Sequence, residues 1–556
     1  MAVGSGWKRA LAIGLALAGA TGAAAATPPP APKLIVVIAV DQLPADLFGR
    51  YRERFTGGMK RLADGVVFPD GYQSHAATEI CPGHSTILTG RHPAATGIVA
   101  NSWFDRKTGS SVYCVAVRGT ADPDARGPQN LKVATFGDWL KAAQPGARVI
   151  AVSAKDRAAI MLGGHHADAV YWWVDGQGFR TSPFAGPAGP AVTAPAEAFD
   201  RALFARWRVT PPALWPAAPA PDCAPFARPH RFGQLMLSGT VPPDAAAGVE
   251  TGDDYPARTD FQDQLRVSPI FDPLALDFAS SLIDADRLGR GAATDLLAIG
   301  LSSTDHIGHR YGNGGAEMCV QMHALDRALG TFMAKLDTLD VPYVVALTAD
   351  HGSVDAAERL TESGIAARRI DGAALLGELN AHLRQALGIA YDPIVGDEPQ
   401  QLFINVAGGD AALRARVRDE AMAWLRGRRE VARIFTADEI AAAAPPKGKP
   451  ADRLSLAERF HESFDRERSG DIIVALAQYA TVGMPRGLGD NVAGHGSPWD
   501  HDRRVPILFW WPGVAPQEHR EAIETVDIAP TLAALAGVAA PAVDGRCLDA
   551  VTSACP

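Results

Sequence analysis

The amino-acid sequence predicts an α/β fold in which a mixed but mostly parallel sheet is sandwiched by helices, with cap-like insertions. Short apolar runs rich in β-branched residues recur along the chain, and segments of helical character lie between them. Continuous apolar runs of this length are typical of strands buried on both faces, as in a parallel sheet covered by helices. The composition, 47% hydrophobic and 21% charged over 556 residues, supplies a sizeable core.

Four apolar runs are the clearest strands, and each is followed by a residue with a reactive or ligating side chain. They are 34–40 before Asp41, 149–152 before Lys155, 296–301 before Asp305 and 343–347 before Asp350. Ligands of such sheets bind outside the carboxyl ends of the strands. We therefore expect these four side chains to meet at one edge of the sheet.

Helices are expected between the strands, at 55–63, 318–336, 411–428 and 527–536. The last begins after an Asp527 N-cap and stops at Gly537. Pro- and Ala-rich stretches at 182–226 and 441–450 break the alternation and indicate surface insertions or linkers. These patterns predict one domain over residues 27–556, with insertions at about 102–270 and about 355–485.

The first 26 residues have the pattern of a secretory signal peptide. Lys8 and Arg9 precede a short apolar run, and small residues lead to an Ala24–Ala26 cleavage-type site. The run is too short for a convincing membrane span, and no later stretch resembles one. We expect a periplasmic or secreted protein without a transmembrane anchor.

Charge and cysteine content narrow the function classes. The formal charge of −9 argues against a nucleic-acid coat function, and an anionic substrate would need local positive charge, which metal ions can supply. The six cysteines are even in number, as expected for disulfides in an oxidising compartment. Only the close pair Cys547 and Cys555 is a reasonable assignment, and no cysteines show zinc-ribbon spacing.

Carboxylates and imidazoles of the kind that bind zinc occur in four fragments of the chain. They are Asp41, Asp305 with His309, Asp350 with His351, and His495 between two glycines. Each fragment alone has an ordinary explanation, such as an aspartate N-cap, a turn or a solvated loop histidine. Together, at strand ends, they indicate a metal site.

With these fragments the chain resembles the zinc-dependent alkaline phosphatase superfamily, specifically the monomeric phosphate-irrepressible alkaline phosphatases related to nucleotide pyrophosphatase/phosphodiesterases. The resemblance covers nearly the whole chain after the signal peptide. Besides the four fragments it rests on Val40-Asp41-Gln42, the run 81–90, the run 97–101 and Lys155-Asp156-Arg157.

The resemblance implies an alkaline phosphatase-like fold and a centre of two Zn²⁺ ions. One ion would be held by Asp305, His309 and His495, and the other by Asp41, Asp350 and His351. Two such ions can clamp the attacking and leaving oxygens of an in-line displacement.

Three further residues match positions at which the family contacts the phosphoryl group. Asn101 would donate to one oxygen, while Lys155 and Arg157 would engage the others, which favours a phosphate monoester. The implied function is a monomeric alkaline phosphatase of broad specificity that acts on small phosphorylated substrates. A phosphodiesterase or nucleotide pyrophosphatase is the alternative enzyme.

The sequence departs from the family at the nucleophile. The family places a threonine two residues before Pro-Gly-His, and that position is Ile80, which has no oxygen to attack phosphorus. Three explanations stay open: a substitute nucleophile, either Thr78 or Cys81; direct attack by metal-bound hydroxide with impaired activity; or a catalytically silent zinc-dependent protein that binds phosphate ligands.

Overall fold

A nine-stranded sheet forms the centre of the computed structural model, which describes residue 1 and residues 31–246, 258–396 and 400–556. The expected signal peptide lies outside the described residues. From one edge to the other the strands are β19 (Gln517–Glu518), β2 (Val66–Tyr72), β18 (Arg504–Trp510), β11 (Tyr343–Thr348), β1 (Leu34–Val40), β10 (Asp295–Leu301), β5 (Val149–Ser153), β6 (Ala169–Val174) and β7 (Gly178–Arg180).

The middle of this sheet is parallel and its edges are mixed. β1 pairs in parallel with β10 and β11, β10 with β5, and β5 with β6. β18 runs antiparallel to both β11 and β2, and β7 runs antiparallel to β6. The prediction of a mixed, mostly parallel sheet is confirmed, and the four predicted strands are β1, β5, β10 and β11.

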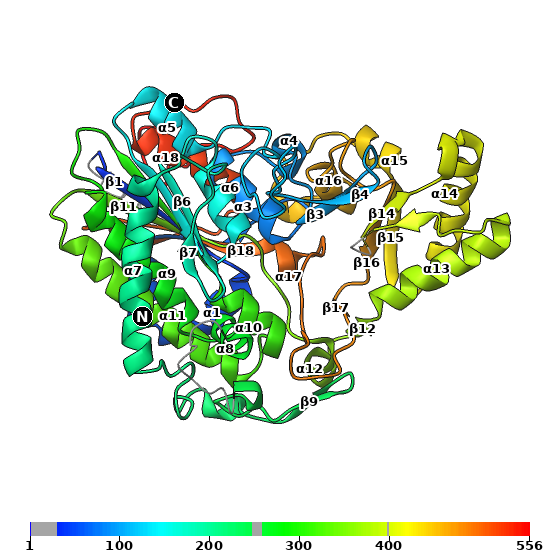
Figure 1. Ribbon diagram of the computed structural model, residues 1–556, viewed down its shortest axis with the longest axis horizontal. Coiled ribbons are helices and arrows are strands. Elements are labelled where there is room, and N and C mark those ends of the chain that lie inside the picture. The colour runs from blue at the N-terminus through cyan, green and yellow to red at the C-terminus, as the bar shows by residue number, and fades with distance from the viewer. Residues whose placement is uncertain (2–30, 247–257, 397–399) are drawn as a thin grey trace.

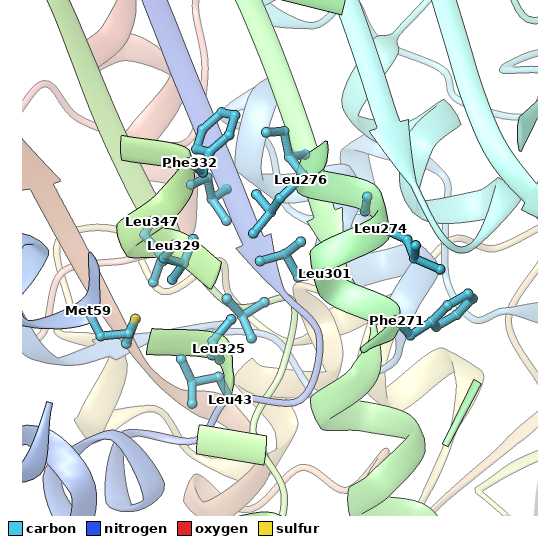
Figure 2. Close-up of a cluster of buried hydrophobic side chains, with 14 of the residues drawn as sticks. Leu43, Met59, Phe271, Leu274, Leu276, Leu301, Leu325, Leu329, Phe332 and Leu347 are labelled. Atoms are coloured by element: carbon cyan, nitrogen blue, oxygen red, sulfur yellow. The ribbon is translucent and has the colours of Figure 1, made fainter. Parts of the chain in front are cut away.

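Helices cover both faces of the sheet (Figure 1). Every residue of β1 is buried, and its side chains alternate between two hydrophobic clusters, with Val36 and Ile38 in one and Ile35 and Val37 in the other. The first cluster includes side chains of α1 (Ala45–Tyr51), α2 (Gly58–Ala63), α7 (Pro190–Val209), α8 (Thr259–Arg266), α9 (Phe271–Ala285), α10 (Ser303–Tyr311) and α11 (Ala316–Asp337). Figure 2 shows part of it, where Leu301 and Leu347 of the sheet meet side chains of α2, α9 and α11.

The second cluster fills the space between the other face of the sheet and four helices. These are α3 (Ile80–Thr89), α5 (Phe136–Ala143), α6 (Asp156–Gly163) and α18 (Ile528–Leu535). α3 and α6 pack against each other. α3 begins at Ile80 and α6 begins directly after Lys155, and both residues belong to the candidate site. The helix layer therefore fixes the position of that site from one side.

Residues 368–482 build a separate unit with its own core, at the right of Figure 1. Its sheet has the order β13 (Ile394–Val395), β14 (Gln401–Ile404), β16 (Ile472–Leu476) and β15 (Val431–Thr436). α13 (Gly372–Leu387) and α14 (Ala411–Arg426) pack on it, and β12 (Arg368–Ile370) pairs with β17 (Ala480–Val482). This unit lies within the range of about 355–485, for which the sequence predicts an insertion.

The insertion expected at about 102–270 needs correction in part, because β5, β6 and β7 belong to the central sheet. The Pro- and Ala-rich stretch 182–226 is not only a linker either, since it contains α7, whose Leu203 and Trp207 are buried in the core. The buried positions of α7 recur at helical spacing. Pro190 is its first residue, where a helix tolerates proline, whereas Pro195 lies inside the helix.

One predicted helix start and one predicted helix cap also differ. The helix expected from residue 55 begins at Gly58, because Asp326 on α11 accepts hydrogen bonds from the backbone amides of Thr56, Gly57 and Met59. α18 begins at Ile528 without a side-chain cap, since the Asp527 carboxylate accepts from the amides of Glu524 and Arg546 instead. The stop at Gly537 is confirmed by its left-handed φ of 67°.

The remaining described elements connect these layers. They are the hairpins β3 (Ser102–Asp105) with β4 (Ser110–Tyr113) and β8 (His230–Phe232) with β9 (Leu235–Leu237), and the short helices α4 (Pro93–Thr96), α12 (Ala357–Glu362), α15 (Ala437–Ala442), α16 (Leu456–His461) and α17 (Asp500–Arg503). Within the described ranges, no helix is both long and apolar enough to cross a bilayer.

Candidate metal centre

The strand ends bring the predicted carboxylates together at one edge of the sheet. Asp41 directly follows β1, Asp305 lies in the first turn of α10 after β10, and Asp350 lies two residues beyond β11. These three strands are immediate neighbours, and Lys155 follows β5, the next strand along. All four side chains are nearly or completely buried. The shared edge that the sequence predicts for them is therefore present.

Asp305, His309 and His495 form the first cluster of possible ligands. Oδ1 of Asp305 lies 3.3 Å from Nε2 of His309, which is one helical turn further along α10, and 3.4 Å from Nε2 of His495. Both imidazoles use Nδ1 to donate to a backbone carbonyl, His309 to Ala493 at 3.0 Å and His495 to Thr78 at 2.8 Å. Such bonds leave the lone pair on Nε2, which is the arrangement that metal-ligating histidines have.

Asp41, Asp350 and His351 are the second set of predicted ligands, called the second cluster below, and none of them is exposed to solvent. The possible ligand atoms of Asp41 and Asp350 lie within 4.8 Å of that of His84, whereas His351 groups in the same way with Asp305 and His495. Nε2 of His351 lies 3.3 Å from Oδ2 of Asp350, and its Nδ1 donates to the Gly352 carbonyl at 2.9 Å. Oδ1 of Asp350 accepts from the backbone amides of Gln42 and His351. The His351 ring also stacks on His495 at a centroid distance of 3.6 Å, so the two clusters are contiguous.

His84 is a member of this site that the sequence reasoning did not single out. It lies on α3, donates through Nδ1 to the Ile80 carbonyl, and places Nε2 3.3 Å from Oδ1 of Asp41. Its Nδ1 is also 3.3 Å from Oδ2 of Asp350. Burial alone lowers the pKa of His84, but Asp350 and Asp41 raise it to about 10. The only sequence signal for it was its place in the run 81–90, which carried the resemblance.

Gly83 allows α3 to approach the Asp350 backbone closely. A Cβ atom at this position would lie 1.9 Å from the carbonyl oxygen of Asp350. A side chain cannot fit at that distance, so the glycine is required for the contact between α3 and the loop after β11. The contact places His84 and Asp350 side by side.

The donor set fits divalent metal ions. Four of its buried atoms have no hydrogen-bond partner: Asp41 Oδ1, Asp305 Oδ1, Asp350 Oδ2 and His351 Nε2. Leaving such a group unsatisfied costs about 1–3 kcal/mol, and more if it is charged. Carboxylate oxygens and neutral imidazole nitrogens are ligands of zinc. Burial is the largest of the effects that lower the pKa of His495 to about 4, which keeps this imidazole neutral.

Lys155 lies between the two clusters. Its Nζ contacts Oδ2 of Asp305 and lies 3.0 Å from Oδ2 of Asp41. Burial lowers the pKa of Lys155, but the two carboxylates outweigh burial and raise it. The same lysine charge helps to hold the pKa of Asp41 below its ordinary value, although burial alone would raise it.

Arg157 and Asn101 lie close to other parts of the site. The guanidinium of Arg157 donates through Nη1 to the Tyr113 hydroxyl at 3.3 Å, and its buried Nε has no partner. The Asn101 amide oxygen accepts from the backbone amide of Cys81 at 2.9 Å, which leaves Nδ2 as its remaining donor. Both side chains thus retain N–H groups that could bind an anion.

Ile80 is the first residue of α3 and is buried. Neither neighbour offers a free nucleophile in its place. The Thr78 hydroxyl is buried and donates to the Ser497 carbonyl at 2.8 Å. Cys81 forms a disulfide with Cys114. Two further disulfides join Cys223 to Cys319 and Cys547 to Cys555, and the second of these confirms the predicted pair.

Comparison with known proteins gives a consistent result. The profile of the family described as type I phosphodiesterase / nucleotide pyrophosphatase matches residues 35–498. Over 533 residues the chain is 42% identical to alkaline phosphatase PhoK of Sphingomonas sp, covering 94% of this chain and 91% of that protein. It is 40% identical over 534 residues to alkaline phosphatase PhoD of Zymomonas mobilis, covering 93% and 88% of the two chains.

A solved structure is also similar over nearly its whole length. The crystal structure of wild-type alkaline phosphatase PafA matches with a TM-score of 0.80 at 26% sequence identity. The match covers 94% of this chain and 99% of the PafA chain. The fold described above is therefore the fold of that enzyme.

Proposed function

Because this chain belongs to the type I phosphodiesterase/nucleotide pyrophosphatase family of the alkaline phosphatase superfamily, we propose that it binds phosphate monoesters at a two-zinc centre and hydrolyses them slowly. The family is metal-dependent, and the named relatives are alkaline phosphatases. The observation that carries the proposal is the convergence of buried carboxylates and imidazoles, several of whose possible ligand atoms have no hydrogen-bond partner. The low rate follows from Ile80, which offers no hydroxyl.

In this proposal Asp305, His309 and His495 hold one zinc ion, and Asp41, Asp350 and His351 hold the other. When bound, the ions neutralise charge on the phosphoryl group and polarise its oxygens. His84 is a positioning residue for Asp41 and Asp350, because it lies within 3.3 Å of both carboxylates.

Three side chains of the chain would bind the phosphoryl oxygens. Lys155 lies between the two carboxylate clusters, where an ammonium group can reach an oxygen that the ions also contact. Arg157 has a buried donor without a partner, and Asn101 retains its Nδ2. Two cations suit a monoester, since a diester carries one charged oxygen fewer. A broad range of small phosphorylated substrates is proposed on the same grounds.

Ile80 supports a second candidate function, the binding of phosphate compounds without turnover. The two neighbouring groups that could replace a nucleophile are engaged elsewhere, Thr78 by the Ser497 carbonyl and Cys81 by its disulfide. Attack would then require a water molecule instead of a side chain. Losing a nucleophile can cost on the order of 10⁶ in turnover, while the rest of a site retains roughly 10³–10⁴ over water.

We place the protein in the periplasm or outside the cell, as a monomer. The three disulfides are supporting observations, because they form and persist in oxidising compartments. N-terminal sequencing of the exported protein, with Thr27 expected as the first residue, tests the cleavage site.

The function is tested by comparing Ile80→Thr with Ile80→Val in the zinc-replenished protein. The two side chains have nearly the same shape, and only threonine has a hydroxyl. We expect Ile80→Thr to raise the initial rate on a p-nitrophenyl monoester by on the order of 10³-fold or more. Ile80→Val is not expected to gain activity. No gain for Ile80→Thr with zinc bound would show that the site is not a latent phosphatase.

Two further measurements separate the alternatives. Initial rates of Ile80→Thr on a monoester and on a diester of the same alcohol distinguish a phosphatase from a phosphodiesterase. Tight binding of inorganic phosphate by the unmodified protein, without measurable turnover of the monoester, would favour the silent binding function.

A further inference from the structure

A second group of possible metal ligands lies outside the candidate centre and shares no residue with it. His92 precedes α4, Glu462 follows α16, and Glu524 precedes the short helical turn Thr525–Asp527. Nε2 of His92 lies 3.6 Å from Oε1 of Glu462 and 3.5 Å from Oε2 of Glu524. The possible ligand atoms of the three residues all lie within 4.8 Å of one another.

These distances are those of atoms that share an ion. Hydrogen bonds from nitrogen to oxygen are usually 2.7–3.2 Å long, and no hydrogen bond joins His92 to either glutamate. Tetrahedral coordination with bonds of about 2.0–2.1 Å separates neighbouring ligand atoms by about 3.3 Å. The His–Asp pairs of the candidate centre lie 3.3–3.4 Å apart, slightly closer than the 3.5 and 3.6 Å of the two His–Glu pairs.

Glu462 gives an independent indication of a ligand. Its side chain is only 7% exposed, and its Oε2 is buried without a hydrogen-bond partner. Water contact or a protein donor would normally satisfy such an oxygen. The carboxylate therefore has an unused ligand atom next to the imidazole.

Ser74 contacts the ring nitrogen of His92 that does not face the glutamates. Its hydroxyl lies 3.2 Å from Nδ1 of His92. A hydroxyl that accepts from the Nδ1–H of His92 selects one tautomer of the imidazole. That tautomer leaves the lone pair on Nε2, directed toward the two carboxylates.

We propose that His92, Glu462 and Glu524 bind a third divalent ion of the zinc class. One imidazole and two carboxylates match zinc better than calcium, which takes only oxygen ligands. The site is structural: it fastens the segment after α3 and the segment before α18 to the end of α16, within the 368–482 unit. The backbone amide of Ala94, which donates to the Glu462 carbonyl, already joins two of these segments.

The rival arrangement has a protonated His92 that balances the glutamates without an ion. Arg503 is buried nearby and would add positive charge. Its guanidinium, however, donates to the Ser74 carbonyl, the Ala451 carbonyl and Asp500. Counting the bound ions distinguishes the two arrangements directly.

The test measures zinc per chain by elemental analysis after the full chain is loaded with zinc and freed of loose metal. Glu462→Gln keeps the size of the side chain and is expected to lose one ion per chain relative to the parent. Glu521→Gln, near Glu524 in sequence and half-exposed, serves as the matched control and is expected to lose none. An unchanged count in Glu462→Gln would overturn the proposal.

Anomalous diffraction from crystals of the parent protein at the zinc edge provides the second measurement. We expect a peak about 2 Å from Nε2 of His92. If Glu462→Gln does not fold, the anomalous peak alone tests the proposal. Its presence supports a bound ion, and its absence overturns the proposal. The outcome is separable from that of the proposed function, because Asp305→Asn should remove zinc from the candidate centre only.

Discussion

Substitution of Gly83 by alanine tests whether close contact between α3 and the Asp350 loop sets up the metal centre. The new Cβ would lie 1.9 Å from the carbonyl oxygen and 2.6 Å from the carbonyl carbon of Asp350. Ordinary non-bonded contacts are about 3.5 Å, so the two backbones must separate by roughly 1.5 Å. No flexible side-chain end can absorb the shift, because all three nearest atoms are backbone atoms.

Overpacking of this kind costs typically about 1–3 kcal/mol, and the gain of about 1 kcal/mol from replacing glycine in a helix offsets only part of it. We expect Gly83→Ala to lower the free energy of unfolding by about 2 kcal/mol, the upper end of the overpacking cost less the helix gain. Asp350 and His351 move with the loop, and a misplacement of about 1 Å can cost on the order of 10²-fold in rate. Weaker zinc binding is expected for the same reason.

Denaturant unfolding and competition with a zinc chelator measure the two effects. Gly377→Ala is the matched control, because Gly377 lies inside α13 and a Cβ atom added there would have no atom within 4 Å. This control should gain about 0.5–1 kcal/mol, as exposed helix glycines do. If Gly83→Ala were equally stabilised, or kept zinc as tightly as the parent, the contact would not be what positions Asp350.

Two further predictions concern buried charges. Lys155→Met should destabilise the chelator-treated protein by about 3–5 kcal/mol, since it leaves Asp41 and Asp305 without their cation. The loss should shrink with zinc bound, and equal losses in unfolding titrations with and without zinc would contradict this. Burial raises the pKa of Asp272 to about 6 from a usual value near 3.8. Its folded form thus holds a proton that the unfolded chain releases, so its contribution to stability is complete below pH 4 and is lost as the pH rises through 6. Asp272→Asn should remove this decline, and parallel pH profiles of the two unfolding midpoints would refute the assignment.

The strands of the central sheet could be predicted because their signal is local. β1, β5, β10 and β11 are continuous apolar runs, and their burial on both faces explains the absence of alternation. The start of α2 could not be predicted, since the side chain that accepts from its first amides belongs to Asp326. This residue lies 267 positions after Met59, one of the residues whose amide it binds. α7 was misjudged because alanine and proline are ambiguous when composition alone is considered.

The meeting of Asp41, Asp305 and Asp350 could be predicted from the sequence, because these candidate ligands follow strands that are neighbours in the sheet. The place of His84 could not be predicted in this way, because its proximity to Asp41 and Asp350 depends on how α3 packs over the sheet. The hydrogen bond that engages the Thr78 hydroxyl could not be predicted either, since its acceptor Ser497 is far away in the chain. Long-range contacts of this kind leave no trace in spacing or composition.

The bond between Cys81 and Cys114 has a consequence for where the protein can mature. Cys81 adjoins Ile80 and donates to Asn101, while Cys114 adjoins Tyr113, whose hydroxyl meets Arg157. One covalent link therefore holds the groups that would surround the phosphoryl oxygens. A chain that folded among cytosolic thiols would lack this link, so these groups would be held together fully only in an oxidising compartment.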